Sequence, residues 1–385
     1  MRVNKFYLFI GLVSLLLVVS GCSDNQETIA KKADKEKTGL PDQMTWSVYD
    51  VGSGGYTEMS AIANMLINEY GTGVRMLPSS SGVARMIPLR EGFASIGKVG
   101  DEVQFSFEAL EEFAQPSWGP QNVRAVWAPP SQYAFAVREN SGIETIADLK
   151  GKKVPKIVGN SSVNFKTEAL LAFGGLTWDD VEVISMTSYS GESEALVQGQ
   201  IDVVGMNPTA SAMIEADSKV GLHWLEMEKD NKEGWDRTQE LAPWLFPEET
   251  NTAVGADGPV TVPNYGYMIA GYADQDPDTI YALTKAMVEH FDQYKGASAN
   301  LTYYAKDEVL TEPIGIPFHK GTIRYFKENG MWSEEKEAKN NALIKRYEGL
   351  REAWEQVKDE AKKKQISDEA FPTYWLKRKE ELLQQ

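Results

Sequence analysis

The sequence predicts an α/β fold of two lobes, each a mostly parallel sheet flanked by helices. Strand-like runs alternate with helical periods over most of the chain, which is the element order of an α/β protein. This order begins near Thr45 and begins again near Lys153. About 340 residues follow the first 43, more than one hydrophobic core usually holds, so we expect two lobes.

A targeting segment opens the chain. Arg2 and Lys5 precede the apolar run 6–19, which is too short and too terminal for an ordinary membrane-spanning helix. The run ends in Val-Ser-Gly before Cys22, the single cysteine of the sequence. These residues resemble the lipobox of bacterial lipoproteins, which implies a signal peptide at 1–21, cleavage before Cys22 and lipidation of its thiol. An uncleaved anchor or an accidental cysteine is the alternative.

A polar segment at 22–43 has no apolar period and is predicted to be a flexible tether. The formal charge of the chain is −17, and it becomes −19 when Arg2 and Lys5 are removed with the signal peptide. Such acidity argues against binding of nucleic acid or of anionic lipid surfaces. It leaves open a small anion held by local backbone dipoles.

The first half of the repeat starts with the strand-like run 45–51 and a Gly-Ser-Gly-Gly turn. A helical period follows and stops at Gly71-Thr72-Gly73. The strand 74–77 then ends in Ser79-Ser80-Ser81, ahead of a short helix that Pro88 should kink or shorten. A strand over 93–99 completes this half.

The second half repeats the order. The strand 153–159 leads into Asn160-Ser161-Ser162 and a helix that ends at Gly174-Gly175. A strand over 181–186, a Ser-Tyr-Ser-Gly turn, a helix through Leu196 and a strand over 200–206 follow. Ordinary α/β alternation is the alternative to a true repeat.

Ser-, Gly- and Asn-rich turns thus stand at the carboxyl ends of strands in both halves. Ligands of open α/β sheets bind beyond those ends, and helix N-termini with hydroxyl groups suit a carboxylate or phosphate. We expect the two lobes to hold a small anion between them. A tight turn without a ligand is the alternative. The candidate ligand contacts are Ser53, Gly54, Gly55, Tyr56, Ser79, Ser80, Ser81, Asp101, Tyr133, Asn160, Ser161, Ser162 and Asn207.

Each candidate also has a structural interpretation. Tyr56 could close over a ligand or pack in the core. Asp101 could bond a ligand amine or cap a helix that begins near Glu102. Asn207 could bind ligand or precede a helix with Pro208 in its first position. Tyr133, near the predicted hinge, could likewise bind ligand or have only a structural role.

The order of these motifs resembles the solute receptors of TRAP transporters, in the TAXI family. The motifs are VGSGGY, LPSSSGVARMIPLREGFASIG, ADLKGKKVPKIVGNSS, LVQGQIDVVGMNP and PIGIPFHKGTIRYFKENG, and they extend over about 46–332. The resemblance implies two lobes of the periplasmic-binding-protein type that close like a Venus flytrap, with lobe I at 44–133 plus 265–385 and lobe II at 134–264. Strands at 133–138 and 264–270 would cross between the lobes.

The sequence departs from this family at several places. Ser53 stands where threonine is usual, which keeps the hydroxyl, and Asn160-Ser161-Ser162 replaces a Ser-Gly-Thr loop. Phe318-His319-Lys320-Gly321-Thr322 stands for the family's Leu-His-Pro-Gly-Ala segment. The segment 223–258 is long, acidic and Trp-rich. In the extended tail Leu343, Tyr347, Leu350 and Trp354 recur at helical spacing, which favours a packed helix over a partner surface.

An enzyme is disfavoured by the residue inventory. The three histidines, His223, His290 and His319, have no metal-ligand spacing, and no Gly-x-Ser-x-Gly motif occurs. Scattered carboxylates would be needed for catalysis. Arginines could clamp a carboxylate, but no motif ranks Arg75, Arg85, Arg90 and Arg124.

The resemblance implies an extracytoplasmic receptor that is anchored at Cys22 to the bacterial cell membrane, on the cell surface or in the periplasm. It would capture a small organic anion, such as a glutamate-like amino acid or dicarboxylate, and deliver it to the integral-membrane TRAP subunits. We expect a monomer with no cofactor, no metal and no nucleic-acid partner. A sensory lipoprotein that reports ligand to a membrane receptor is the alternative, and a carboxylate-based enzyme is a remote one.

Overall fold

The computed structural model describes residues 39–383, and from Leu40 on they belong to one folded unit, Leu40–Gln385. The predicted signal peptide, Cys22 and the tether up to residue 38 lie outside the described residues. Within 39–383 no helix is both long and apolar enough to cross a membrane.

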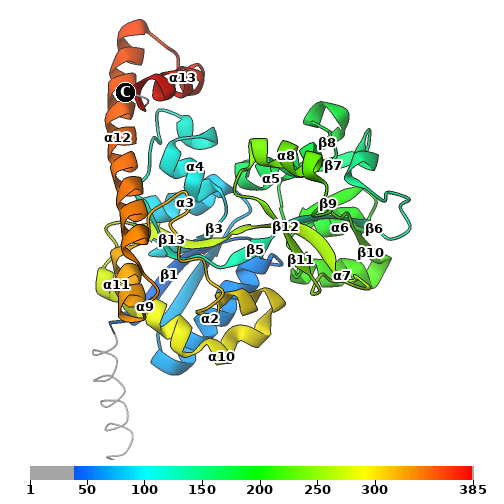
Figure 1. Ribbon diagram of the computed structural model, residues 1–385, viewed down its shortest axis with the longest axis horizontal. Coiled ribbons are helices and arrows are strands. Elements are labelled where there is room, and N and C mark those ends of the chain that lie inside the picture. Colours follow the sequence, from blue (N-terminus) through cyan, green and yellow to red (C-terminus); the bar gives the residue numbers. More distant parts are fainter. Residues whose placement is uncertain (1–38, 384–385) are drawn as a thin grey trace, which may run out of the picture. The chain divides into compact units, whose positions relative to one another are not determined.

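The first sheet is mixed and lies in the part of the unit that we call lobe I (Figure 1). β1 runs parallel to β2 and β3, while β13 is antiparallel to β3 and β4, so four strands share one direction. Its strands, in spatial order, are β2 (Gly73–Pro78), β1 (Gln43–Val48), β3 (Ile96–Val99), β13 (Met268–Tyr272) and β4 (Val123–Trp127).

The first two helices of lobe I match the sequence prediction. Ser53 is the N-cap of α2 and accepts a hydrogen bond from the Tyr56 N–H, and Gly71 ends the helix in the left-handed conformation. Pro88 lies in the last turn of α3, which ends at Arg90. The helices are α2 (Gly54–Tyr70), α3 (Gly82–Arg90), α4 (Glu102–Glu108), η1 (Glu111–Ala114), α9 (Pro277–Glu289), α10 (Phe291–Tyr294), η4 (Lys295–Ala297), η5 (Ala299–Tyr304) and α11 (Lys320–Glu328).

Lobe II repeats this strand order. The Asp202 N–H donates to the Lys153 carbonyl at 2.9 Å, which places β7 beside β9 and joins a parallel pair to a three-stranded sheet. The resulting order is β8 (Glu182–Met186), β7 (Lys153–Ile157), β9 (Val203–Met206), β6 (Ala134–Arg138) and β10 (Leu222–Trp224), with β6 antiparallel to its neighbours. The helices are η2 (Ile146–Leu149), α5 (Ser161–Phe173), η3 (Trp178–Asp180), α6 (Gly191–Val197), α7 (Ser211–Val220) and α8 (Lys232–Leu241). The predicted two-lobed α/β fold with mostly parallel sheets is confirmed.

Two segments cross between the lobes. β5 (Pro130–Gln132) pairs antiparallel with β12 (Val260–Gly266), and β12 pairs with β11 (Phe246–Thr250). The predicted crossing strand at 133–138 is instead β6 of lobe II, and the short β5, which ends one residue before Tyr133, precedes it in the crossing segment. The strand predicted at 264–270 is likewise divided between β12 and β13.

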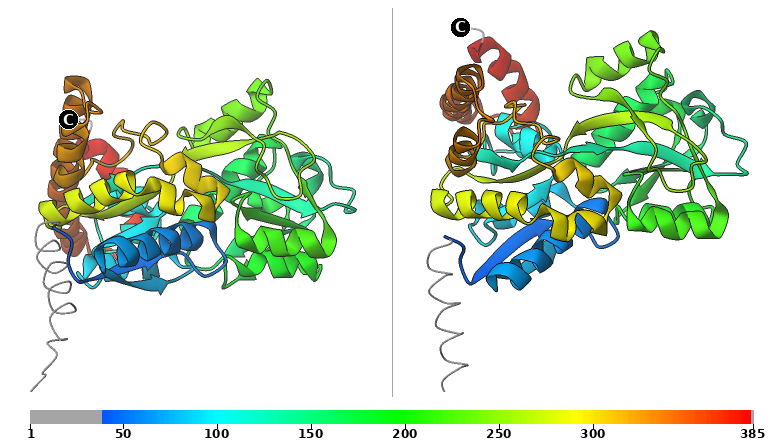
Figure 2. Two further views of the ribbon diagram at one scale, coloured as in Figure 1. Left: turned by 90° about the horizontal axis from the view of Figure 1, so that it is seen from below. Right: turned by 60° about the horizontal axis from the view of Figure 1, so that its bottom comes forward.

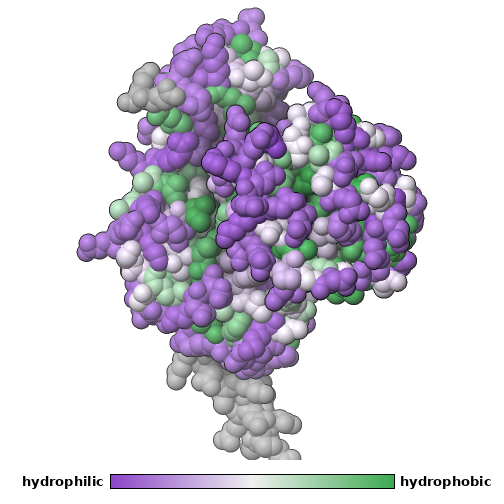
Figure 3. Space-filling view, turned by 45° about the vertical axis from the view of Figure 1, so that its right-hand side comes forward, coloured by the Kyte–Doolittle hydropathy of each residue, from purple (hydrophilic) through white to green (hydrophobic). Residues whose placement is uncertain are grey.

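Each sheet has its own buried core. Trp46 and Trp127 belong to the lobe I cluster, and Phe135 and Leu170 belong to the lobe II cluster. The face in Figure 3 is mostly hydrophilic, in keeping with the acidic composition.

The tail packs on lobe I as α12 (Glu334–Lys364) and α13 (Phe371–Leu383). Both helices lie on the side of lobe I that faces away from lobe II (Figure 2). Leu350 and Trp354 of the predicted stripe are buried, and the Trp354 and Trp375 ring centroids are 4.8 Å apart. The predicted packed helix is therefore confirmed.

Candidate functional site

A small cavity of about 20 Å³ lies between the two lobes. Lobe I, lobe II and the crossing segments all contribute to its wall. The lining residues are Tyr49, Ser53, Gly54, Gly55, Ser131, Tyr133, Val163, Lys166, Tyr189, Asn207, Tyr265 and Tyr267. Such a volume holds about one water molecule, so a larger ligand requires the lobes or side chains to move.

The N-terminus of α2 faces this cavity. The backbone N–H groups of Gly54 and Gly55 line it and make no hydrogen bond within residues 39–383, as expected for the first turn of a helix. A Cβ on Gly55 would collide with the Tyr267 hydroxyl, so glycine lets the tyrosine approach the backbone. These N–H groups can donate to an anion.

Five buried tyrosines form much of the wall. The Tyr49 ring centroid lies 5.8 Å from those of Tyr189 and Tyr267, in edge-to-face contacts. Burial raises the pKa of Tyr189, Tyr265 and Tyr267 well above the usual value, so these phenols stay neutral donors. Their hydroxyls make no hydrogen bond to any described residue. Apart from Tyr133, sequence reasoning missed these residues, although Tyr265 and Tyr267 stand in the predicted return segment.

Lys166 is the cation of the cavity. It lies on α5, and its Nζ donates to Ser162 Oγ at 2.9 Å and pairs with Asp101 of lobe I. Burial raises the pKa of Asp101, while Lys166 opposes the shift. Sequence reasoning missed Lys166. Its position four residues after Ser162, on the same helical face, was the available signal.

Two other buried ion pairs support the cavity from lobe I. Arg85 Nη2 lies 2.8 Å from Glu102 Oε1, and the guanidinium carbon is 3.4 Å from the Tyr49 ring centroid. Lys98 Nζ lies 3.3 Å from Glu58 Oε2, and burial lowers the pKa of Lys98 to about 8. Arg85 is thus committed to Glu102.

The other three candidate arginines do not line the interlobe cavity. Arg75 is exposed on β2, and Arg90 packs over the Trp118 ring. Arg124 lines a different cavity.

Several predicted residues join the lobes instead of lining the cavity. Ser80 Oγ donates to the Thr187 carbonyl at 3.1 Å, and Ser81 Oγ donates to the Gly159 carbonyl at 3.0 Å. The Asn160 amide donates to the Ser80 carbonyl at 2.6 Å. We call these contacts the seam between the lobes.

The seam also includes the residues that directly precede α2. Asp50 Oδ2 accepts from Ser190 Oγ at 2.9 Å and from the Ser190 N–H at 3.1 Å. The Gly52 carbonyl accepts from Ser211 Oγ at 3.2 Å. Polar turns of both lobes therefore bond to one another directly.

The predicted residues thus separate into three groups. Ser53, Gly54, Gly55, Tyr133 and Asn207 line the cavity. Ser80, Ser81, Asp101, Asn160 and Ser162 make bonds between the lobes. The structure brings neither Tyr56, Ser79 nor Ser161 to the cavity wall.

The three predicted residues that neither line the cavity nor join the lobes have other environments. Tyr56 is partly buried against the lobe I core, and Ser79 Oγ accepts from the Ser81 N–H at 3.2 Å. Ser161 Oγ is buried without a hydrogen-bond partner in the described part of the chain. All three remain predictions as ligand contacts.

Two structural alternatives are wrong. Asp101 occupies the N-cap position of α4 but its side chain makes no capping bond, because it turns to Lys166. Asn207 and Pro208 do not start a helix, since α7 begins at Ser211. Instead, the Asn207 amide donates to Ser131 Oγ at 3.0 Å and to the Gln132 carbonyl at 3.2 Å. No cluster of metal-ligating side chains occurs in residues 39–383.

The profile of the NMT1-like family matches residues 56–330. Among solved structures, the periplasmic aliphatic sulphonate binding protein of Escherichia coli is 17% identical, with 76% of this chain and 88% of that chain covered and a TM-score of 0.42.

Two further solved structures are similar at the same level. An amino acid ABC transporter substrate-binding protein of Streptococcus pneumoniae, bound to L-arginine, gives 15% identity, coverage of 72% and 97%, and a TM-score of 0.40. An R. palustris protein with adipate is 12% identical, with 65% of this chain and 84% of that chain covered and a TM-score of 0.45. Such low similarity says nothing about the ligand of this chain.

Proposed function

The chain belongs to the NMT1-like family, and we propose that it is a solute-binding receptor that captures a small organic anion between its lobes. The observation that carries the proposal is the wall of the interlobe cavity, where the N–H groups of Gly54 and Gly55 meet Lys166 and the neutral phenols. All of these groups donate hydrogen bonds, and Lys166, whose charge Asp101 pairs, has one N–H left after its bonds to Asp101 and Ser162. A carboxylate is their natural acceptor.

Binding is coupled to movement of the lobes. The cavity of about 20 Å³ is too small for a glutamate-sized molecule, and the seam bonds hold its rim closed. Ligand enters when the seam opens, and the bonds of Ser80, Ser81 and Asn160 re-form after capture. In this proposal the seam residues hold the two lobes together, and the cavity residues contact the ligand.

The tyrosine wall favours a ligand with a compact body beside its anionic group. Rings of Tyr49, Tyr189 and Tyr267 supply apolar faces, and their environment disfavours a second bare charge without its own partner. A glutamate-like amino acid or a dicarboxylate would place its second polar group toward Ser131, whose hydroxyl accepts from Asn207 and can donate its own hydrogen to the ligand.

We further propose that the receptor serves a TRAP-type transporter of the TAXI class, with Cys22 as its lipid anchor in the cell membrane. The order of the motifs over 46–332 supports this assignment. An ABC-type membrane component is the competing partner. The alternative function is that of a sensory lipoprotein, which would bind ligand in the same interlobe cavity and pass the ligand state to a membrane receptor.

A genetic experiment separates these roles. A strain without the chain should lose uptake of the solute that the purified protein binds, and the wild-type gene should restore uptake. A Gly55→Val variant should fail to restore it, whereas Gly296→Ala, at a glycine whose Cβ would meet no neighbour, should succeed. Normal uptake in the deletion strain would contradict transport and favour sensing.

A further inference from the structure

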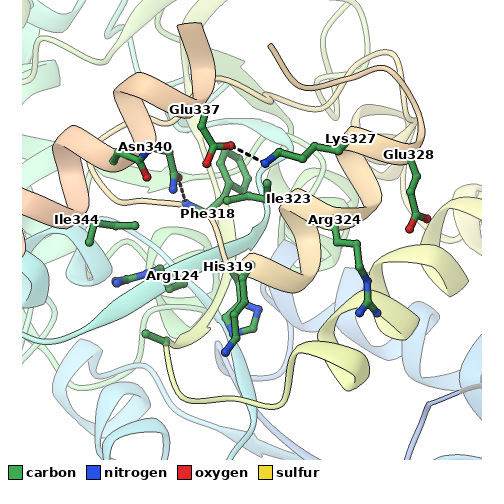
Figure 4. Close-up of a pocket in the computed structure, with 13 residues that line it drawn as sticks. Arg124, Phe318, His319, Ile323, Arg324, Lys327, Glu328, Glu337, Asn340 and Ile344 are labelled. Atoms are coloured by element: carbon green, nitrogen blue, oxygen red, sulfur yellow. Dashed lines mark hydrogen bonds and ion pairs between the residues drawn. The ribbon is translucent and has the colours of Figure 1, made fainter. Parts of the chain in front are cut away.

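A second cavity of about 510 Å³ lies on lobe I, away from the interlobe cavity. It is bounded by the start of β4, by α11 and by α12 (Figure 4). Arg124 and Ile344 lie on one side, and Arg324 and Glu328 lie on the other. No residue lines both cavities.

Arg124 is a buried cation without an acidic partner. The residue is 8% exposed, and its Nη1 donates to the carbonyl of the adjacent Val123 at 2.8 Å. No carboxylate oxygen of the described residues lies within 4.0 Å of its guanidinium. A guanidinium stays protonated even when buried, and a buried charge is costly unless it is paired. Burial also lowers the pKa of Arg124.

The other charged groups of the wall are already satisfied. Lys327 Nζ lies 2.9 Å from Glu337 Oε2, and Arg324 Nη1 lies 2.7 Å from Asp278 Oδ1. Glu328 accepts a hydrogen bond from the Tyr281 hydroxyl at 2.6 Å. Four cationic side chains and two carboxylates line the wall, which leaves an excess of positive charge, and Arg124 is the buried cation among them.

A neutral donor stands beside this charge. Asn340 is 2% exposed, and its Oδ1 accepts from the Phe318 N–H at 2.7 Å, which fixes the orientation of the amide. Its Nδ2 lines the cavity region without a hydrogen bond to residues 39–383. Phe318, Ile323 and Ile344 supply apolar surface between these polar groups.

We propose that this cavity is a second ligand site, which binds a small organic monoanion through Arg124 and Asn340 and holds its apolar body against Ile323 and Ile344. The volume lies in the range of small-molecule pockets, and one carboxylate supplies the acceptors that Arg124 lacks. The site is independent of the function proposed for the interlobe cavity.

The second cavity lies where α12 packs on lobe I. Residues 56–330 match the family, whereas Asn340 and Ile344 belong to α12, outside that match. A ligand here contacts β4 and α11 of lobe I and also α12, so it fastens the C-terminal helices to the lobe. We expect bound anion to raise the thermal stability of the full chain.

The test uses the full chain in mild detergent, with benzoate and hexanoate as probes and benzamide as a neutral match for benzoate. Ligand-observed NMR and thermal unfolding should show binding of at least one carboxylate and none of benzamide. Arg124→Met removes the charge at nearly constant volume and should weaken binding about tenfold or more. Arg75→Met, at an exposed arginine of β2, is the matched control and should bind as the wild type does.

A second variant tests the cavity without touching the charge. Ile344→Trp should fill the space and abolish binding, while Gly55→Val in the interlobe cavity should leave it unchanged. Because Arg124 has no acidic partner to lose, Arg124→Met should fold normally, which a melting temperature at or above the wild-type value would show. Failure of both carboxylates to bind, or equal binding by wild type, Arg124→Met and Ile344→Trp, would overturn the proposal.

Discussion

Lys166 on α5 of lobe II forms an ion pair with Asp101, which follows β3 of lobe I. Both side chains are nearly inaccessible, at 3% and 2% exposure. The Lys166 cation of the interlobe cavity is therefore paired by a carboxylate of the opposite lobe. Opening the lobes must separate these charges, so the pair couples lobe position to the charge available for a ligand.

Asp101→Asn should shift the protein toward an open form. Loss of one partner from a buried pair typically costs about 3–5 kcal/mol, and Lys166 can regain solvation when the lobes separate. Small-angle scattering should therefore report a larger radius of gyration than for the wild type. Asp278→Asn breaks an exposed pair with Arg324 and is the control. An unchanged radius for Asp101→Asn would contradict this role.

Glu192 should lose its proton in the folded protein only above the usual pH range of a glutamate. Burial raises its pKa well above the usual value, and the Gly205 N–H donates to Oε2 at 3.0 Å. Because the folded pKa is raised, the stability that Glu192 contributes is full below pH 4.5 and falls as pH rises toward the folded pKa.

Glu192→Gln should consequently melt at or above the wild-type temperature at pH 7.5, and the melting temperature of the variant relative to the wild type should rise as pH increases from 4.5. Glu102→Gln is the contrasting variant. Arg85 holds the pKa of Glu102 below its usual value against the effect of burial, so this change should lower the melting temperature. A lower melting temperature for Glu192→Gln at pH 7.5 would show that the carboxyl is ionised.

His319 should destabilise the protein in acid. Burial lowers its pKa from 6.5 to about 4, and its Nδ1 accepts from the Gly321 N–H as the N-cap of α11. Between these values the unfolded chain binds the proton and the folded chain does not. Stability present above pH 6.5 is therefore lost as pH falls to about 4, by up to about 3 kcal/mol.

His319→Asn keeps a capping oxygen but does not titrate. The difference in unfolding free energy between this variant and the wild type should be constant above pH 7 and should shift in favour of the variant between pH 6.5 and 4. Chemical denaturation at several pH values measures it. A pH-independent difference would contradict the prediction.

Trp375 should anchor the C-terminal helices. It is 0% exposed, and its indole N–H donates to the Ala109 carbonyl at 2.8 Å. Trp375→Ala should lower the free energy of unfolding by about 3–5 kcal/mol, as measured by denaturant titration. Leu376→Ala, at a neighbour that is 41% exposed, should change it little. Similar losses for both would argue against anchoring by Trp375.

Local signals in the sequence were sufficient for the fold. Ser53 and Gly71 bound α2 through capping chemistry that depends on a few neighbouring residues. The repeat was visible because both lobes place polar turns after corresponding strands, and the two sheets do share one strand order. The break at Tyr133 between β5 and β6 escaped prediction because both strands are short.

The site was only partly predictable, since its partners are distant in sequence. Ser81 of lobe I bonds to Gly159 of lobe II, and Lys166 of lobe II pairs with Asp101 of lobe I, although each pair is more than 60 residues apart in the sequence. A hydroxyl-rich turn looks the same in sequence whether it binds a ligand or the opposite lobe. The tyrosine wall likewise assembles from four separate stretches, and no local pattern distinguishes Tyr189 or Tyr267 from a core aromatic.

The most direct test is a calorimetric titration of the full chain, in mild detergent, with glutamate, succinate, fumarate and 2-oxoglutarate. We predict that at least one of these carboxylates binds. Gly55→Ala should weaken that binding by about tenfold or more, because its Cβ forces the Tyr267 hydroxyl to move, while Gly296→Ala should bind as the wild type does. Binding of none of the four, or equal binding by Gly55→Ala and the wild type, would contradict the assignment of the interlobe cavity as an anion site.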